Sequence, residues 1–286
     1  MKVLSLFLAF ASLLFGSHLL LAQQLYISNE PQQILELLDV PTGKITTLYT
    51  IGQRPDDLIL NAQGQLLYSV PSMSVNGVTT GNIYIYDPVK KSNAILVPGV
   101  KGARDMTIEP GGQSMLIAIY SPGKIMRFNF QTGTTTVVAQ KLGTCDGIAY
   151  DSKGHLFAVA NHNTIVQIDP VKGTILKTLV LEAHHATNGG DGLTFDPYTG
   201  ELWASHDGTT GSGLLEIPTD LSTFTYYDFS KVIHAPDGIK SDGKGNLYVG
   251  ALWTAAVFNI QTATPTLTHS YVVKGADGVS LVPGTY

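Results

Sequence analysis

One acidic position recurs along this chain, each time just before a short apolar run. Three copies read CDGIAYDSKGHLFAVA, GDGLTFDPYTGELWAS and PDGIKSDGKGNLYVGA, and looser copies begin with PDDLIL, RDMTIE and ADGVSL. The aspartates at this position are Asp56, Asp105, Asp146, Asp191, Asp237 and Asp277. If the fold gathers them, their carboxylates repel one another and must be protonated, paired or bound to a cation. Ca²⁺ prefers such oxygen ligands, so a calcium site is one interpretation of the pattern.

A second interpretation is purely local. An aspartate before a glycine can accept hydrogen bonds from backbone N–H groups of the adjacent loop, which would fix the turn in every copy. Arg54 and Arg104 lie close to two of the aspartates and can neutralise them. Further aspartates end the apolar run before a glycine-containing turn and are expected to be turn residues; these are Asp151, Asp196 and Asp242.

The spacing of the repeat indicates what must position these side chains. Successive aspartates are 49, 41, 45, 46 and 40 residues apart. A period in the forties with several short strands per unit is typical of a propeller blade. Each unit contains a short first strand such as GIKSD, a glycine turn, a second strand such as NLYVG, and two more strands. The pattern therefore predicts an all-β chain built from four-stranded blades.

The two ends of the chain complete one another. The N-terminal region offers a second, third and fourth strand in QLYIS, ILELLDVPTGK and TTLYTIG, without a first strand. The C-terminal ADGVSLV is a first strand with nothing after it. We therefore expect a six-bladed β-propeller whose last blade is closed by three N-terminal strands plus one C-terminal strand. Closure would remove the sheet edges that an open array would leave, and residues 23–286 would form a single domain.

In such a ring the first strands line the central channel, and the loops around their entry form one face. The repeated aspartates should converge at this mouth, which is the usual place for a ligand. Loops after the second strands add polar and aromatic side chains, which we interpret as substrate-binding: Glu30, Tyr120, Asn161, His162 and Trp253. His206 is a candidate acid–base group, although a loop histidine can equally be a hydrogen-bonded structural residue.

Composition and the N-terminus bear on the location. Residues 1–22, MKVLSLFLAFASLLFGSHLLLA, combine one lysine with a long apolar run, which predicts a cleaved signal peptide and a secreted protein, extracellular or periplasmic; an uncleaved anchor is the alternative. The formal net charge of −5 and the lack of a basic stripe argue against nucleic acid as a partner. Cys145 is the only cysteine and is expected to be buried and inert, because no neighbouring positive charge lowers its pKa.

The repeated units resemble the senescence-marker/gluconolactonase/luciferin-regenerating family of six-bladed propellers, with similarity to NHL-repeat propellers. The resemblance extends over nearly all of the expected mature chain and rests on the three Asp-Gly copies quoted above. It implies a divalent cation, often Ca²⁺, in the channel and hydrolysis of lactones or phosphoesters. It also implies metal ligands at four positions: Asp56, Asp146, Asp191 and Asp237. Of these, Asp237 matches the family's Pro-Asp-Gly context directly, whereas the other three are aspartates where the family has glutamate or asparagine.

Three functions follow as hypotheses. The first is a secreted, metal-dependent hydrolase of lactones or related esters, in which Asp237 or His206 activates water and a small molecule is the substrate. The second is a non-catalytic propeller that binds a ligand or a protein through the same face. The third is a biosynthetic lyase, isomerase or cyclisation enzyme, since the propeller fold does not determine the chemistry. In none of them does the mature chain require a membrane.

Overall fold

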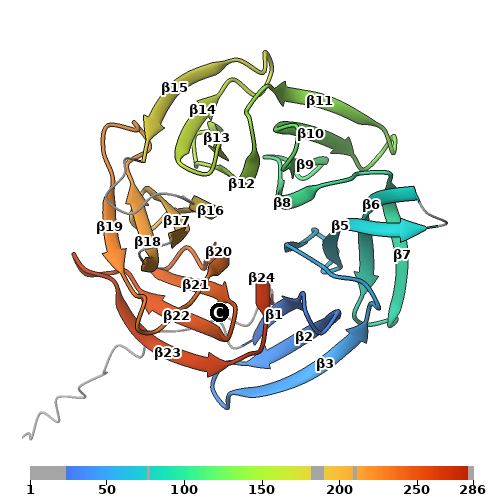
Figure 1. Cartoon of the computed structure of the whole chain (residues 1–286), viewed down its shortest axis with the longest axis horizontal. Helices are drawn as coiled ribbons and strands as arrows, with labels where there is room; N and C mark the ends of the chain where they lie inside the picture. Colours follow the sequence, from blue (N-terminus) through green and yellow to red (C-terminus); the bar gives the residue numbers. More distant parts are fainter. Residues whose placement is uncertain (1–23, 76–77, 182–189, 209–210, 283–286) are drawn as a thin grey trace, which may run out of the picture.

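A computed structural model describes residues 24–75, 78–181, 190–208 and 211–282, and these form six four-stranded antiparallel sheets around a central channel (Figure 1). The strands nearest the channel are the first strands that the repeat predicted. They are β4 (Leu58–Leu60), β8 (Ala103–Ile108), β12 (Cys145–Tyr150), β16 (Gly190–Asp196), β20 (Pro236–Ser241) and β24 (Ala276–Leu281). The predicted six-bladed propeller is confirmed. The predicted signal peptide lies outside the described residues.

The remaining strands of each blade run outward in sequence order. The second strands are β1 (Gln24–Asn29), β5 (Leu66–Val75), β9 (Ser114–Ile119), β13 (Leu156–Ala160), β17 (Glu201–Gly208) and β21 (Asn246–Ala251). The third strands are β2 (Ile34–Asp39), β6 (Val78–Asp87), β10 (Lys124–Asn129), β14 (Thr164–Ile168), β18 (Gly211–Ile217) and β22 (Thr254–Asn259). The outer strands are β3 (Lys44–Thr50), β7 (Ser92–Pro98), β11 (Thr135–Gln140), β15 (Ile175–Val180), β19 (Thr225–Asp228) and β23 (Thr266–Val272).

The ring closes between the two ends of the chain, as predicted. Strand β24 pairs with β1, placing Leu25 opposite Leu281 and Ile27 opposite Val279, so the C-terminal strand becomes the first strand of the N-terminal blade (Figure 1). Among the described residues, no helix is long and apolar enough to cross a membrane.

The core lies between neighbouring blades. Leu116 of β9 packs in one buried cluster with Ile148 of β12 and Leu156 of β13, so adjacent blades share an apolar layer. Cys145 belongs to the same cluster and is fully buried. Burial, together with the nearby Asp146 carboxylate, raises the pKa of its thiol well above the usual value, which agrees with the expected inert role.

The turn aspartates also behave as predicted. Asp151 accepts hydrogen bonds from the backbone N–H groups of Lys153 and His155, at 2.9 and 2.8 Å. Asp196 accepts a hydrogen bond from the Thr199 N–H, and Asp242 accepts hydrogen bonds from the N–H groups of Lys244 and Asn246. These carboxylates fix the turns at the end of the channel opposite its mouth.

Candidate active site at the channel mouth

The strand register corrects the predicted ring of six aspartates at one position. In β8, Ala103 and Met106 face β9 across a bulge, as Cys145 and Ile148 face β13 in the next blade. Two residues lie between the paired positions in each case. Arg104 is therefore the structural counterpart of Asp146, whereas Asp105 occupies the position that other blades give to glycine.

Serine contacts between blades support this alignment. A serine hydroxyl on a second strand donates to a backbone carbonyl of the next blade, and the acceptors are Asp56 for Ser28, Arg104 for Ser69 and Asp237 for Ser205. Because Arg104 receives the same contact as two of the aspartates, it belongs to the same ring. We call this set the mouth ring: Asp56, Arg104, Asp146, Asp191, Asp237 and Asp277.

The glycine after each ring aspartate allows the blades to approach closely. A Cβ atom placed on Gly192 would lie 2.5 Å from the carbonyl oxygen of Asp237, and one on Gly147 would lie 2.5 Å from that of Asp191. Neither distance is tolerated between non-bonded atoms, so a side chain at these positions would push apart the strands that line the channel. In the repeated Asp-Gly pair, the aspartate is therefore the ring residue and the glycine leaves room for the backbone of the next blade.

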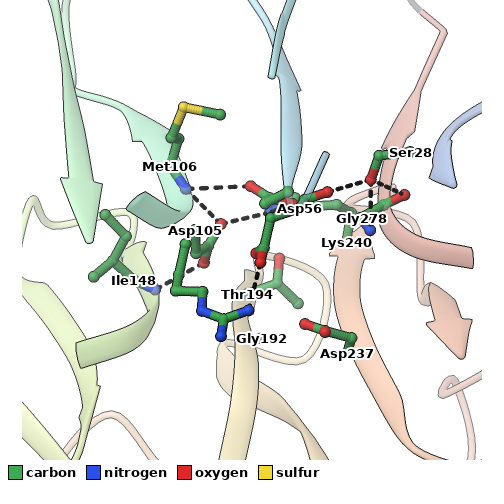
Figure 2. A network of polar contacts seen from close by, with 12 residues as sticks. Ser28, Asp56, Asp105, Met106, Ile148, Gly192, Thr194, Asp237, Lys240 and Gly278 are labelled. Atoms are coloured by element: carbon green, nitrogen blue, oxygen red, sulfur yellow. Dashed lines mark hydrogen bonds and ion pairs between the residues drawn. The ribbon is translucent and has the colours of Figure 1, made fainter. Parts of the chain in front are cut away.

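Two blades replace this glycine with aspartate, and a lysine from a third blade compensates. The Nζ atom of Lys240 lies 3.1 Å from Asp105 Oδ1, a contact drawn in Figure 2, and 3.6 Å from Asp57 Oδ1. Asp105 also accepts hydrogen bonds from the backbone N–H groups of Met106 and Ile148, at 2.7 and 2.8 Å. We call Asp57, Asp105 and Lys240 the channel triad. The predicted capping role therefore holds for Asp105, one layer below the mouth ring.

Arg104 is held within the mouth ring by two contacts. Its Nη1 atom lies 2.5 Å from Asp56 Oδ2, and its guanidinium lies 5.1 Å from the centre of the Tyr120 ring. The expectation that Arg104 neutralises a nearby carboxylate is met, but the partner comes from the preceding blade. Burial nevertheless raises the pKa of Asp56 to about 7, because the loss of solvation outweighs the attraction of the guanidinium.

The mouth ring contains five aspartates and only one arginine, so Arg104 cannot neutralise all of the carboxylates if they are ionised. Burial raises the pKa of Asp146 to about 7, against the opposing effect of Arg104. Burial, and then repulsion from Asp237, raises the pKa of both Asp191 and Asp277 well above the ordinary range. The mouth therefore holds buried acids whose ionised forms need a further cation or a proton.

Two cavities open beside the ring. The mouth cavity has a volume of about 220 Å³ and is lined by Arg104, Tyr120, Asp146, His162, Gly190, Asp191 and Asp207. In it, the Tyr120 hydroxyl lies 2.9 Å from His162 Nε2, and His162 Nδ1 lies 3.5 Å from Asp146 Oδ2. The side cavity is larger, about 340 Å³, and shares Arg104 and Tyr120 with the mouth cavity. Its lining residues are Glu30, Arg54, Pro71, Ser72, Lys101, Gly102, Arg104, Tyr120 and Ser121.

The predicted substrate-binding residues divide into two groups. Tyr120 and His162 line the mouth cavity, and Glu30 lines the side cavity, where Arg54 Nη2 lies 2.8 Å from its carboxylate. Asn161 is exposed, and Trp253, which is 49% exposed, stacks beneath Lys274; neither lines the two cavities.

His206 also lies away from both cavities. It is 2% exposed and packs edge-on against Tyr226. The prediction treated it as a loop residue, but β17 continues to Gly208, so His206 is a strand residue with a buried side chain. Its neighbour Asp207 is the residue that reaches the mouth cavity.

The donor set of the mouth fits a hard divalent cation. The Oδ2 atom of Asp146 is buried with no hydrogen-bond partner among the described residues, although His162 Nδ1 lies 3.5 Å from it. In the ring, Asp146 stands between Arg104 and the carboxylate of Asp191. Across the described ranges, no three His, Cys, Asp or Glu side chains already form a group that could hold a metal ion. The mouth still offers several carboxylate oxygens, the ligand type that Ca²⁺ prefers, so the chemistry of the donors fits such an ion although the group is not preformed.

Comparison with known proteins agrees with the fold. A family model described as the SMP-30/gluconolactonase/LRE-like region matches residues 11–192. No curated protein matches the sequence.

Several solved structures share the propeller fold at low sequence identity. A chain of a nidogen/laminin complex is 13% identical with a TM-score of 0.72, covering 91% of this chain and 98% of that one. A hydrazine synthase chain from Kuenenia stuttgartiensis is 15% identical with a TM-score of 0.65, covering 91% and 87%. A putative 6-phosphogluconolactonase from Bacteroides fragilis is 14% identical with a TM-score of 0.61, covering 90% and 96%. Likeness at this level of identity concerns the fold alone.

Proposed function

Because the chain belongs to the SMP-30/gluconolactonase/LRE-like family, we propose that it is a metal-dependent hydrolase of lactones or related esters that acts at the mouth of the channel. The excess of buried carboxylates in the mouth ring over its single arginine carries this proposal. In their ionised form these carboxylates need a cation, and oxygen donors select Ca²⁺ or a similar ion. The substrate is a small molecule, in keeping with cavities of about 220 and 340 Å³.

Asp146, Asp191 and Asp237 would hold the cation, since Asp56 is already bound by Arg104. A cation at this position would supply Lewis-acid activation of the scissile carbonyl. Asp56, the fourth of the predicted ligands, is not assigned to the cation in this proposal; it is the partner that keeps Arg104 in place.

The chain's own residues account for the remaining requirements of ester hydrolysis. Arg104 faces the mouth cavity and can donate to the oxygen on which negative charge develops when water attacks the carbonyl. Asp237 accepts the proton that the attacking water loses. The leaving alkoxide takes a proton from His162, whose ring is oriented by the Tyr120 hydroxyl and the Asp146 carboxylate. His206 has no part in this scheme because it is buried away from the cavity.

Hydrolysis of a panel of aliphatic lactones and esters by the purified protein tests the proposal. We expect activity that a chelator abolishes and that added Ca²⁺ restores. A protein that binds no divalent ion and hydrolyses no member of the panel with any of them contradicts it, and would favour a ligand-binding propeller instead. Secretion with cleavage after Ala22 is part of the proposal, and N-terminal sequencing of exported protein checks it.

A further inference from the structure

The side cavity carries positive charge on an otherwise acidic protein. Arg54, Lys101 and Arg104 line it, and Glu30 is the one carboxylate among its lining residues. Since Arg104 is paired with Asp56, the remaining two positive charges and one negative charge leave about +1 on this wall, whereas the whole chain carries −5. A cavity of this charge beside a ring of carboxylates is selective for anions that would be repelled from the ring itself.

The three cations differ in what already engages them. Arg54 lies 2.8 Å from Glu30, and Arg104 lies 2.5 Å from Asp56. Lys101 is exposed at the rim and forms no ion pair within the described part of the chain. An entering anion therefore finds Lys101 without an ion-pair partner and must compete with Glu30 for Arg54.

Arg104 connects the side cavity to the reaction site. It lines both the side cavity and the mouth cavity, and Tyr120 forms part of the wall of each. A guanidinium has five N–H donors in a rigid plane, so the contact with Asp56 leaves others for a ligand. A molecule that spans the two cavities would pass directly over this side chain.

We infer that the side cavity binds an anionic group, a carboxylate or a phosphate, on a substrate whose reacting carbonyl lies in the mouth cavity. This assignment rests on the proposed function and narrows it to acidic lactones or esters. Lys101 and Arg54 contact the anionic group, Glu30 weakens its binding by competing for Arg54, and Arg104 faces both ends of the substrate.

Binding of inorganic phosphate and of succinate, measured by calorimetric titration at low ionic strength, tests the anion site without any turnover. We expect Lys101→Gln to weaken binding about tenfold, as for the loss of one charge-assisted contact. Glu30→Gln should strengthen it about threefold by releasing Arg54. Lys153→Gln is the matched control, because Lys153 is an exposed lysine in the turn between β12 and β13, at the far end of the channel. Absence of binding, or equal affinities in all four proteins, overturns the inference.

A kinetic comparison identifies which anion is used. A neutral lactone is assayed against the same ring bearing a carboxylate or a phosphate, and a preference for either anionic form should fall about tenfold in Lys101→Gln but persist in Lys153→Gln. Hydrolysis without any such preference overturns the substrate class while leaving the proposed function intact. If no lactone is hydrolysed, the proposed function fails, and the titration alone then decides whether the anion site exists.

Discussion

Lys240 stands where two other blades carry threonine, and this lysine lets two aspartates lie below the mouth ring. Its counterparts are Thr107 in β8 and Thr194 in β16, each directly after the apolar residue of the first strand. Without the lysine, Asp57 and Asp105 would be buried acids with no cation. The ion pair joins residues far apart in sequence: Lys240 and Asp105 are 135 positions apart.

Replacing Lys240 with threonine should therefore destabilise the fold. We expect the free energy of unfolding to fall by about 3 kcal/mol, because removing one member of a buried ion pair leaves the other uncompensated. Urea denaturation measures the change, with Lys153→Thr as the control for an exposed lysine. Adding Asp57→Gly, the residue type of four other blades, should recover part of the loss. A Lys240→Thr protein as stable as the wild type would show that the triad contributes nothing.

Asp237 differs from the triad because it contributes negative charge to a ring that already has an excess. Asp237→Asn should lower lactone hydrolysis by a hundredfold or more, on the order expected when the positioning of a metal is lost. Stability should change little or rise, since the variant removes charge from a repelling cluster. Asp220→Asn, in an exposed turn, is the control. Activity retained within a factor of three would remove Asp237 from the site.

At the scale of the element, each first strand has two adjacent requirements: a ring residue and then a small residue. The serine hydroxyls of β1, β5 and β17 fix the ring residue of the next blade, and the glycine that follows a ring aspartate gives that blade room. The first strands are thus held by contacts between blades as well as within them, which keeps the mouth ring at a fixed width.

Two glycines of β16 show whether the small residue is needed for packing against the next blade, because only Gly192 lies close to that blade's backbone. Gly192→Ala would place Cβ 2.5 Å from the Asp237 carbonyl, whereas the contacts of a Cβ on Gly190 begin at 3.5 Å. We expect Gly192→Ala to lower the melting temperature by roughly 10 °C and Gly190→Ala to change it by only a few degrees. Thermal unfolding followed by circular dichroism measures both. Equal melting temperatures would mean that the blades do not need this close approach.

The sequence predicts the elements better than the site. The repeat of Asp-Gly, turn and alternating strand was enough to place four strands per blade and the closure of the ring. The sequence placed Asp105 in the ring, but the ring residue of this blade is Arg104. Counting two residues back from the apolar Met106, instead of matching aspartates, would have identified it. The burial of His206 depends on how far β17 extends, and the pairing of Lys240 depends on contacts between blades. Neither has a local sequence signal.

For the whole molecule, ring closure makes the last blade essential to the others. Deleting Ala276 to Tyr286 removes β24 and leaves β1 and the neighbouring first strands without a partner. We expect the truncated chain to lose its cooperative unfolding transition entirely, because an open ring exposes sheet edges and half of an apolar layer. Val272→Ala serves as the control, because Val272 is an exposed residue of the outer strand β23 and takes no part in closing the ring. An unchanged melting temperature after truncation would contradict closure through β24.

The buried carboxylates of the mouth ring should make the stability of the whole molecule depend on pH, and a bound cation should change this dependence. Burial raises the pKa of Asp56 and of Asp146 from the ordinary value of 3.8 to about 7. Between pH 4 and 7 the folded state therefore binds more protons than the unfolded state, so stability falls as the pH rises through this window. The melting temperature of chelator-treated protein should accordingly drop by several degrees between pH 5 and 8. Excess Ca²⁺ should restore it at pH 8 and have little effect at pH 5, where a proton occupies Asp146, one of the proposed ligands. A melting temperature that does not depend on pH, with or without Ca²⁺, would show that the mouth ring is neutralised entirely by Arg104 and other residues of the chain.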